Sequence, residues 1–556
     1  MQPHNPTWSA GAPRFARQDL ADLQRTQGDD AAWRAALASD PATALREIKG
    51  SFAVATTDAR GRTILAVDRF GIASLCYRLT AGGILHAPRA DAIAEGAELN
   101  LQALFDYLYF HVIPAPATVF EGVLRLPPAH YAVFEAGQLR VEPYWVPRFE
   151  AERAPSFGAL RDEFRSLIEQ AVAREVDADK PACFLSGGTD SSTVAGMIGR
   201  VLGKPAMAYS IGFGAEGYDE IEYARIAARH FGSEHHEYYV TPEDLVRAIP
   251  DVAAYYDQPF GNSSALPAFL CASVARGDGV RKLLAGDGGD ELFGGNTRYA
   301  KQKIFGLYDH VPAALRSGLL EPFARQHLSQ RVPLVKKAAS YVNQARAGMP
   351  DRMMSYNLLD RLGHAEVLTP ALLARLDTQA PLRHQREQWQ MVKSGTLVDR
   401  MLAYDWRYTL ADCDIPKVVG TAAMAGLDVG FPLLDDDLLD FSLRLPASYK
   451  VRGLKLRWFF KEALRGFLPD AILTKKKHGF GLPFGVWAHS HTGLKAMAAD
   501  SLYSLAERGV VRKPFVESLF STRLTEHAGY YGEMVWILMM LEQWLQAKAP
   551  AFHVAE

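Results

Sequence analysis

The chain has 556 residues, of which 48% are hydrophobic and 22% are charged, and its formal net charge is −2 at pH 7. This length predicts two to four domains, and mixed charges without a basic stripe argue against nucleic acid as a partner. No apolar run approaches membrane-spanning length and no N-terminal signal pattern is present, so we expect a cytoplasmic protein without a membrane partner. Four cysteines lie far apart and are expected to be free thiols: Cys76, Cys183, Cys271 and Cys413.

The N-terminal part of the chain alternates short apolar runs with turn residues. Its pattern predicts hairpins at 48–71 and 75–87, then a helix at 101–110 and a strand pair that ends at Trp145. Most of the first fifty residues are expected to be a helix with a loop. We expect one domain over residues 1–148 and a second over 149–556.

Residues 182–192, ACFLSGGTDSS, are the most distinctive segment. Residues 182–185 form the apolar run expected of a buried strand. Gly187 and Gly188 let the backbone turn sharply and approach a ligand, and a helix is expected to begin near Asp190, where free N–H groups favour an anion. An ordinary polar loop is the alternative for Ser-Gly-Gly alone. The segment predicts a pyrophosphate cradle made by Leu185, Ser186, Gly187, Gly188, Asp190, Ser191 and Ser192.

Residues 281–295, RKLLAGDGGDELFGG, again predict a strand, a glycine turn and an acidic cluster. Three carboxylates within five residues, at Asp287, Asp290 and Glu291, repel one another unless a cation offsets them. A solvated acidic turn is the alternative. The functional hypothesis is that Asp190 and Asp290 together hold Mg²⁺, which prefers hard oxygen ligands and grips phosphates.

Both segments resemble motifs of the asparagine synthetase family, SGGxDS and G(E/D)G(S/G)DE(L/V)FGGY. The resemblance extends to 208–213, AYSIGF, and to 474–484, TKKKHGFGLPF, which is similar to the family's RxKxGFGxP loop. It implies an ATP pyrophosphatase-type α/β domain with a parallel sheet of the adenine nucleotide α-hydrolase class. It also implies ATP and Mg²⁺ as cofactors and a set of site residues. Ser210, Ile211 and Gly286 would contact ATP, Asp287 would act as a base or orient one, and Lys477 would stabilise charge on an acyl-adenylate, with Lys475 assisting.

The N-terminal region resembles the later part of the family's glutamine amidotransferase domain, an Ntn-type α+β fold. The family's DRFGIxPLYY appears at 68–77 as DRFGIASLCY. Glutamine hydrolysis in that family needs a cysteine directly after the initiator methionine, whereas here Met1 is followed by Gln2 and no cysteine occurs before Cys76. We therefore expect a degenerate domain that makes no ammonia from glutamine, because no acyl-enzyme forms without a nucleophile.

The acceptor segment departs from the family as well. KVDRxSMAxxLExRxPFLD appears at 417–435 without its Asp-Arg pair, and its later arginine is Gly430. Arginine grips carboxylates in a bidentate fork that glycine cannot replace, so free aspartate would be held differently. The alternative is that those arginines are structural and that Lys417 compensates.

Helices are expected over 301–410, with Met353, Met354 and Leu358 in the core, and an amphipathic helix over 530–544.

The resemblance implies ATP-dependent amide formation through an acyl-adenylate, with release of AMP and pyrophosphate. The carboxylate and amine are expected to be small molecules or peptides. We favour a relative without glutaminase activity, such as a lasso-peptide macrolactam cyclase working with a precursor peptide and a leader protease. The alternatives are an asparagine synthetase fed by ammonia and a catalytically decayed scaffold.

Overall fold

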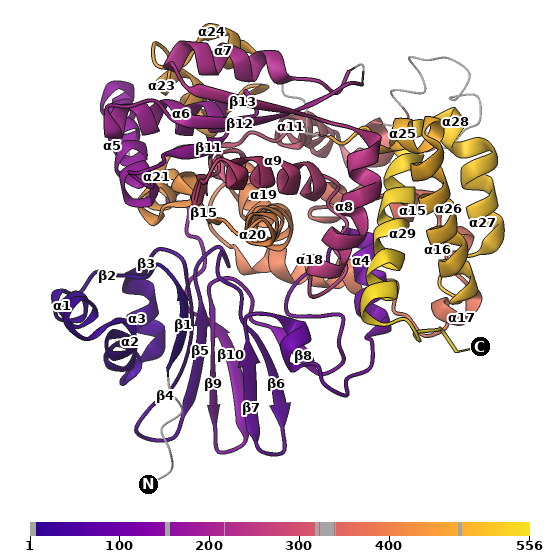
Figure 1. The fold of residues 1–556 in the computed structure, drawn as a ribbon, viewed down its shortest axis with the longest axis horizontal. Coiled ribbons are helices and arrows are strands. Elements are labelled where there is room, and N and C mark those ends of the chain that lie inside the picture. The colour runs from indigo at the N-terminus through magenta and orange to yellow at the C-terminus, as the bar shows by residue number, and fades with distance from the viewer. Residues whose placement is uncertain are drawn as a thin grey trace.

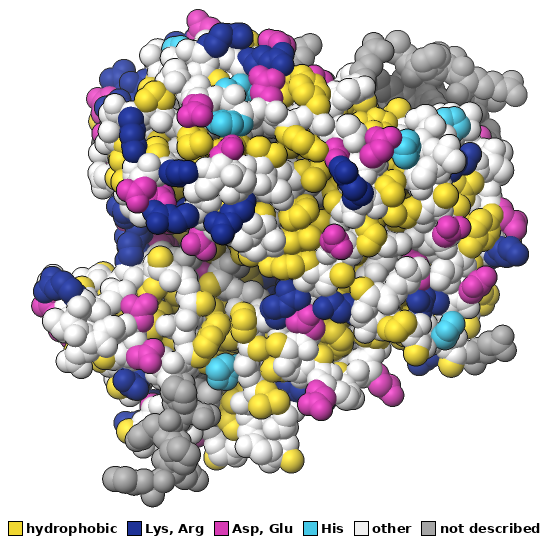
Figure 2. Space-filling view, in the orientation of Figure 1, with side chains coloured by type: hydrophobic (Ala, Val, Ile, Leu, Met, Phe, Trp, Pro, Cys, Tyr) yellow, Lys and Arg dark blue, Asp and Glu magenta, His cyan; other side chains and the backbone are white. Residues whose placement is uncertain are grey.

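The computed structural model describes residues 7–150, 156–215, 217–316, 341–475 and 481–555, together with the single residues 318, 322 and 339. Figure 1 shows a strand-rich N-terminal lobe beneath a larger lobe in which helices surround a parallel sheet. The last helices of the chain, in yellow, stand side by side at one end of the larger lobe (Figure 1). The face in Figure 2 carries acidic and basic side chains interspersed, rather than a patch of one sign.

Three antiparallel sheets lie in the described part of the N-terminal lobe, and the third is the two-stranded pair of β2 (Arg14–Phe15) and β3 (Ile48–Lys49). The first has the order β1-β4-β5-β9-β10 and the second β7-β6-β8. The predicted hairpins are confirmed as β4–β5 and β6–β7. The strands are β1 (Trp8–Gly11), β4 (Phe52–Thr57), β5 (Thr63–Val67), β6 (Cys76–Thr80), β7 (Gly83–Ala87), β8 (Val123–Arg125), β9 (His130–Glu135) and β10 (Gln138–Pro143).

Side chains of β4 and β5 alternate between two cores, as the period of two in a strand requires. Phe52 and Val54 pack with Trp33 of a helical layer, whereas Ala53 and Ala55 face the second sheet. The central strands β4 and β5 of the first sheet are therefore buried on both faces. This explains why these strands are apolar runs rather than alternating ones.

The first fifty residues differ from the expected helix with a loop. They form strands β1 and β2 (Arg14–Phe15) and three short helices: α1 (Gln18–Gln27), α2 (Asp29–Leu37) and α3 (Pro41–Glu47). Gly28 separates α1 from α2, and its backbone φ of 86° is one that residues other than glycine rarely adopt. Asp40 caps α3 by accepting a hydrogen bond from the Ala42 N–H, and Pro41 begins the helix.

A five-stranded sheet, all parallel, forms the centre of the larger lobe, in the order β13-β12-β11-β14-β15. Starting from β11, the strands β12 and β13 are added on one side of it, and the later strands β14 and β15 are added on its other side. The order therefore reverses between β11 and β14, where α/β sheets bind ligands at the carboxyl ends of their strands. The strands are β11 (Ala182–Phe184), β12 (Met207–Phe213), β13 (Glu234–Val240), β14 (Lys282–Leu284) and β15 (Asp428–Gly430).

Helices cover both faces of this sheet. Cys183 and Leu284 pack in one core with Phe164 of α5 (Phe157–Glu175) and Val194 of α6 (Thr189–Leu202). On the other face, Ala182, Tyr209 and Leu283 contribute to a smaller core with residues of α9 (Ala265–Gly277) and α20 (Ile415–Met424). The predicted parallel-sheet α/β fold is confirmed.

The C-terminal helix α29 (Ala528–Lys548) is buried on almost every side, so the expectation of an amphipathic helix was wrong. Its sequence from Met534 to Leu541 contains no polar residue and leaves no solvent-facing stripe. The helix packs on α25 (Phe484–Ser490), α26 (Thr492–Glu507) and α8 (Pro242–Tyr255). None of the helices in the described ranges has the length and apolarity needed to cross a bilayer.

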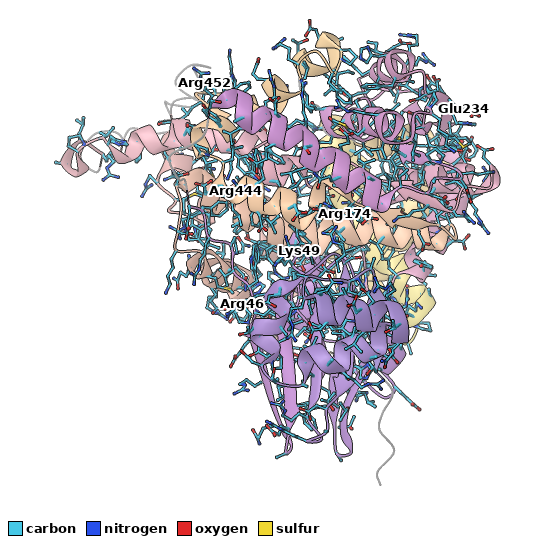
Figure 3. The ribbon with its side chains drawn as sticks, turned by 90° about the vertical axis from the view of Figure 1, so that its left-hand side faces the viewer. Arg46, Lys49, Arg174, Glu234, Arg444 and Arg452 are labelled. Carbon is cyan, nitrogen blue, oxygen red and sulfur yellow. The ribbon has the colours of Figure 1, made fainter. Side chains whose placement is uncertain are left out.

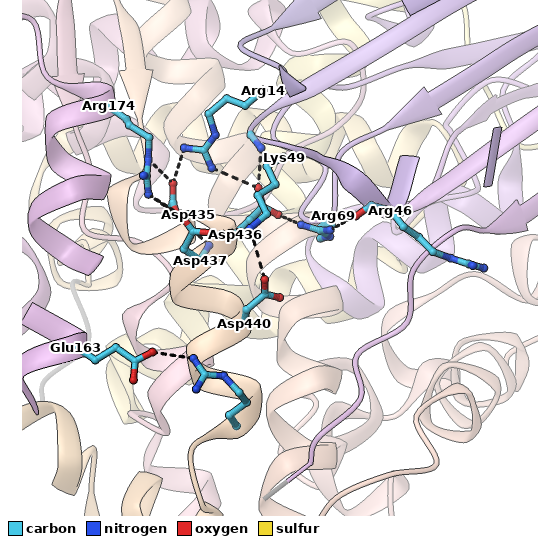
Figure 4. A network of polar contacts seen from close by, with 12 residues as sticks. Arg14, Arg46, Lys49, Arg69, Glu163, Arg174, Asp435, Asp436, Asp437 and Asp440 are labelled. Atoms are coloured by element: carbon cyan, nitrogen blue, oxygen red, sulfur yellow. Dashed lines mark hydrogen bonds and ion pairs between the residues drawn. The ribbon is translucent and has the colours of Figure 1, made fainter. Parts of the chain in front are cut away.

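Ion pairs join the two lobes. Asp435, Asp436 and Asp437 lie at the start of α21 (Asp436–Arg444), and they face basic side chains of the N-terminal lobe (Figure 4). Arg14 Nη1 lies 2.8 Å from Asp435 Oδ2, and Lys49 Nζ lies 2.6 Å from Asp437 Oδ1. In Figure 3, Lys49 lies at the top of the N-terminal lobe, below Arg174 of α5.

Candidate nucleotide and acyl-transfer site

The predicted phosphate segment forms the strand, turn and helix that its sequence indicates. β11 ends at Phe184 and α6 begins at Thr189. Gly187 has φ of 67°, and a Cβ on it would lie 2.3 Å from the Ala224 nitrogen, so only glycine fits there. Ser191 Oγ accepts a hydrogen bond of 3.1 Å from the Ser186 N–H and lies 3.0 Å from Ser186 Oγ. The loop is therefore wound tightly around the N-terminus of α6.

The second glycine turn lies directly against the first. β14 ends at Leu284, and the short helix α10 (Gly289–Phe293) follows. A Cβ on Gly286 would lie 2.7 Å from the Ser191 nitrogen, and one on Gly289 would lie 2.0 Å from Asp190 Oδ1. The two segments that the sequence singled out therefore meet at the point where the strand order of the sheet reverses.

Asp190 and Asp290 share one guanidinium. Arg457 Nη1 lies 2.7 Å from Asp190 Oδ2 and 2.8 Å from Asp290 Oδ1, and its Nη2 bonds the other oxygen of Asp190. Arg457 is 6% exposed, and its guanidinium carbon lies 4.3 Å from the centre of the Phe460 ring. Burial opposes the positive charge, but the two carboxylates outweigh this effect and raise the pKa of Arg457.

Arg457 was not singled out from the sequence. Its backbone has φ of 53°, a left-handed conformation that is unusual outside glycine, at the start of α23 (Trp458–Ala463). Its N–H donates to the Gly294 carbonyl at 3.1 Å, which holds it beside the acidic turn. The sequence feature that could have predicted such a residue is the excess of carboxylates at 287–291, because these charges need a cation from elsewhere in the chain to offset them.

Two carboxylates that share one guanidinium are close enough to share a metal ion. Among the described residues no group of three or more His, Cys, Asp or Glu side chains could hold a metal. Two carboxylates suit an ion that takes its remaining ligands from water and phosphate, as Mg²⁺ does. The residues present fit the predicted magnesium site, although Arg457 already provides positive charge there.

Asp287 lies at the edge of this cluster and faces Lys417. Lys417 Nζ is 3.7 Å from Asp287 Oδ1 and 2.9 Å from Asp414 Oδ1. Burial raises the pKa of Asp287 to about 6, although Lys417 acts in the opposite direction. A carboxyl group that titrates near neutral pH is suited to proton transfer at physiological pH.

Ser210 and Ile211 lie beyond the end of β11, because β11 pairs with β12 only as far as Tyr209. Ser210 Oγ donates to the Leu185 carbonyl at 2.5 Å and lies 2.7 Å from His235 Nε2. This bond attaches the strand β12 to the beginning of the phosphate loop. The two residues predicted to contact adenine therefore adjoin the predicted phosphate site.

Lys477 lies outside the described residues, so its predicted role remains a prediction. Its neighbour Lys475 is described, and its Nζ lies 3.1 Å from Glu220 Oε2 and 4.4 Å from the centre of the Tyr223 ring. The charge of Lys475 is thus paired within the protein. An assisting role for this lysine also remains a prediction.

The space beside Gly430 is occupied by the ends of neighbouring side chains. A Cβ there would lie 2.7 Å from Glu175 Oε2 and 2.8 Å from Leu284 Cδ2. These atoms are the far ends of side chains, so an arginine at this position would require the Glu175 and Leu284 side chains to rearrange. The departure from the family pattern is therefore accompanied by closer packing around β15.

A parallel sheet with two glycine turns at its switch point, and paired carboxylates beside them, is typical of nucleotide-binding α/β enzymes. A family model described as asparagine synthase matches residues 163–546, and one described as a glutamine amidotransferase domain matches residues 17–145. The chain therefore belongs to the asparagine synthase family, whose members are ATP-using ligases that form C–N bonds.

Three similar proteins illustrate the range of the family. A putative glutamine-hydrolyzing asparagine synthetase of Mycobacterium tuberculosis is 28% identical over 469 residues, which cover 80% of this chain and 68% of the relative. Glutamine-hydrolyzing asparagine synthetase 1 of Bacillus subtilis is 22% identical over 512 residues, 90% of this chain and 78% of the relative. Amidase chry2 of Gibberella zeae is 30% identical over 488 residues, 80% of this chain and 71% of the relative.

Proposed function

We propose that the protein forms an amide by adenylating a carboxylate with ATP and transferring the acyl group to an amine. The observation that carries this proposal is the meeting of the two glycine turns with Asp190, Asp290 and Arg457. The N-terminus of α6 and the loop before it would receive the phosphates, and Arg457 would offset their charge. Where Mg²⁺ is present, Asp190 and Asp290 would hold it, and it would neutralise charge on the phosphates.

The carboxylate oxygen would attack the α-phosphorus, breaking its bond to the bridging oxygen and releasing pyrophosphate. The amine nitrogen would then attack the acyl carbon, and the bond from that carbon to the AMP oxygen would break. Asp287 would accept the proton that the nitrogen loses, since its carboxylate form is available above a pKa of about 6. Lys417 would hold Asp287 in place through their 3.7 Å contact.

We further propose that the N-terminal domain has no glutaminase role. Cys76 is the one cysteine in residues 1–148, and it is fully buried in β6. Burial raises the pKa of its thiol to about 11, so it is not an available thiolate nucleophile. The domain would instead stabilise the synthetase domain through the ion pairs to Asp435, Asp436 and Asp437.

Two finer identities remain. A macrolactam cyclase, acting on a precursor peptide with a leader protease as further partner, is favoured by Gly430 and by the burial of Cys76, the one cysteine of residues 1–148. An asparagine synthetase is favoured by the names of the relatives in Mycobacterium and Bacillus, which describe glutamine-hydrolyzing enzymes, and in this chain it would be fed by free ammonia. The clustering of Asp190, Asp290 and Arg457 supports an active enzyme over a decayed scaffold.

The test is a pyrophosphate-release screen of candidate carboxylates with ATP and Mg²⁺, with the nucleotide product identified by mass spectrometry. We expect AMP and pyrophosphate from the wild type, and none from Asp190→Ala. Formation of ADP instead of AMP would contradict the proposal. Release with aspartate and ammonia alone would identify an asparagine synthetase.

A further inference from the structure

An open cavity of about 520 Å³ is lined by residues of α4 (Leu101–Phe110), residues 353–358, η5 (Trp406–Asp414) and the start of α29. Cavities of this size accommodate organic molecules, whereas ammonia needs far less space. Met353 and Leu358 are buried as expected, but together with Met354 they also line this cavity. Its aromatic lining comprises Tyr109, Phe110, Tyr356, Tyr404, Tyr408 and Tyr530.

The cavity borders the cluster of charges around Asp287. Cys413 lines the cavity, and Asn262 Nδ2 donates to both Cys413 Sγ, at 3.2 Å, and Asp414 Oδ1, at 3.3 Å. Asp414 in turn pairs with Lys417, which faces Asp287. The cavity is therefore linked to Asp287 through Cys413, Asp414 and Lys417.

Two charged groups line the cavity, and one of them is already compensated. Arg298 donates to Asp405 Oδ2 at 3.1 Å through Nε, to Asp405 Oδ1 at 2.5 Å through Nη2 and to Thr409 Oγ1 at 2.8 Å. Because Asp405 is fully buried, this pairing fixes the guanidinium. Arg298 thus contributes no uncompensated positive charge to the cavity.

The other charged group is Glu533, in the second turn of α29. Within the described part of the chain, its ion-pair partner is the His111 ring, with Nδ1 3.6 Å from Oε1. Burial lowers the pKa of His111 to about 4, so the ring is neutral at physiological pH and does not compensate the carboxylate. Among the described groups that line the cavity, Glu533 is therefore the uncompensated charge, and it favours a cation over an anion. The rings of Tyr356 and Tyr530 already have Lys301 and Arg361 over them.

The aromatic rings add to this preference. Phe110 and Tyr408 are stacked with their centroids 5.4 Å apart and an angle of 12° between their planes. Aromatic faces attract ammonium groups and provide apolar surface for a ligand body. Aromatic rings with one uncompensated carboxylate suit a molecule that is cationic at one end and apolar at the other.

We propose that this cavity binds the amine substrate of the acyl transfer, and that this substrate is a primary amine with an aromatic or apolar body. Its ammonium group pairs with Glu533, and its body packs against Phe110 and Tyr408. The inference rests on the proposed amide-forming function and names the class of amine that serves it. Both a free arylalkylamine and the N-terminal residue of a peptide have this chemistry.

The test is calorimetric binding to the full chain in the absence of ATP. The probes are phenethylamine, the peptide amide Phe-Gly-NH2 and, as an anion of similar shape, 3-phenylpropionate. We expect one or both amines to bind at least about 10-fold more tightly than the anion, and the tighter of the two identifies a free amine or a peptide as the source. Equal binding of amines and anion, or no binding of either amine, would overturn the proposal.

Glu533→Gln preserves shape and removes the charge, so amine affinity should fall about 10-fold or more. Glu526→Gln is the matched control, because its exposed carboxylate lies on the preceding short helix α28 (Leu524–Glu526) and does not line the cavity. Wild-type affinity in Glu533→Gln would refute the role of this carboxylate. Asp190→Ala should bind the amine normally while losing pyrophosphate release, so a failure of adenylation is distinguished from a failure of amine binding.

Discussion

The guanidinium of Arg457 and the carboxylate of Asp190 are joined by two hydrogen bonds, although the residues are 267 positions apart in the chain. The same guanidinium reaches Asp290, 167 positions away. The acidic turn and the phosphate loop thus obtain their compensating charge from α23. The site is held together by an arginine that belongs to neither of its two motifs.

Arg457→Met should lower pyrophosphate release at least about 100-fold, because it leaves two carboxylates facing each other and the incoming phosphates. Arg457→Lys should recover part of the activity, since an ammonium keeps the charge but not the fork that spans both carboxylates. The measurements are ATP–pyrophosphate exchange and thermal unfolding. Exchange by Arg457→Met within threefold of wild type would show that the arginine is structural.

Activity should depend on the ionisation of Asp287. Its pKa in the folded protein is raised to about 6, so the rate of acyl transfer should fall as pH decreases below 6. Asp287→Asn should lower the rate about 100-fold or more and abolish this limb of the pH profile. The rate of acyl transfer is measured at each pH as single-turnover amide formation from preformed acyl-adenylate. An unchanged acidic limb in the variant would assign the titration to another group.

The same pKa has a consequence for stability. A carboxyl group whose folded pKa exceeds its unfolded value of about 3.9 favours folding most when protonated, and this contribution is lost as pH rises from about 4 to 6. Relative to Asp287→Asn, the wild type should therefore lose stability across this interval. Denaturant unfolding at pH 4, 5, 6 and 7 measures the difference. A constant difference across these values would contradict the shifted pKa.

The junction of the lobes should depend on Asp436, which is 5% exposed and accepts a hydrogen bond of 2.6 Å from the Gly50 N–H as well as bonding Arg69. Asp436→Asn leaves the buried Arg69 without its anion and should destabilise the protein by about 3–5 kcal/mol. Asp440→Asn is the control, because Asp440 is half-exposed and lies 3.7 Å from Lys49. Calorimetric unfolding should separate the two variants. Equal effects would show that the junction depends on total charge rather than on this contact.

Gly187→Ala should weaken ATP binding, because its Cβ would collide with the Ala224 nitrogen and its left-handed backbone would be strained. Gly199→Ala, on the helix α6 that follows the loop, is the control, since its Cβ would lie an ordinary 3.8 Å from the Lys204 carbonyl oxygen. We expect nucleotide affinity to fall at least about 10-fold in the first variant and to be unchanged in the second. Equilibrium dialysis with labelled ATP measures both, and equal affinities would argue against the cradle.

The sequence alone predicted the local elements of the larger lobe. Apolar runs followed by glycine turns indicated β11 and β14, because strand, turn and helix start are each specified by neighbouring residues. The same reasoning predicted the hairpins β4–β5 and β6–β7. It failed for α29, because a helix enclosed by other helices has no polar stripe to reveal its orientation.

Only the tertiary structure decided which distant side chains meet. It placed Arg457 between Asp190 and Asp290, set Asp436 against Arg69, and brought Glu533 to a cavity lined by Phe110 and Tyr408. Charge pairing and cavity shape depend on residues more than a hundred positions apart, and no local pattern encodes their partners. Local motifs therefore identified where the chemistry takes place, whereas long-range packing determined which charges and which cavity serve it.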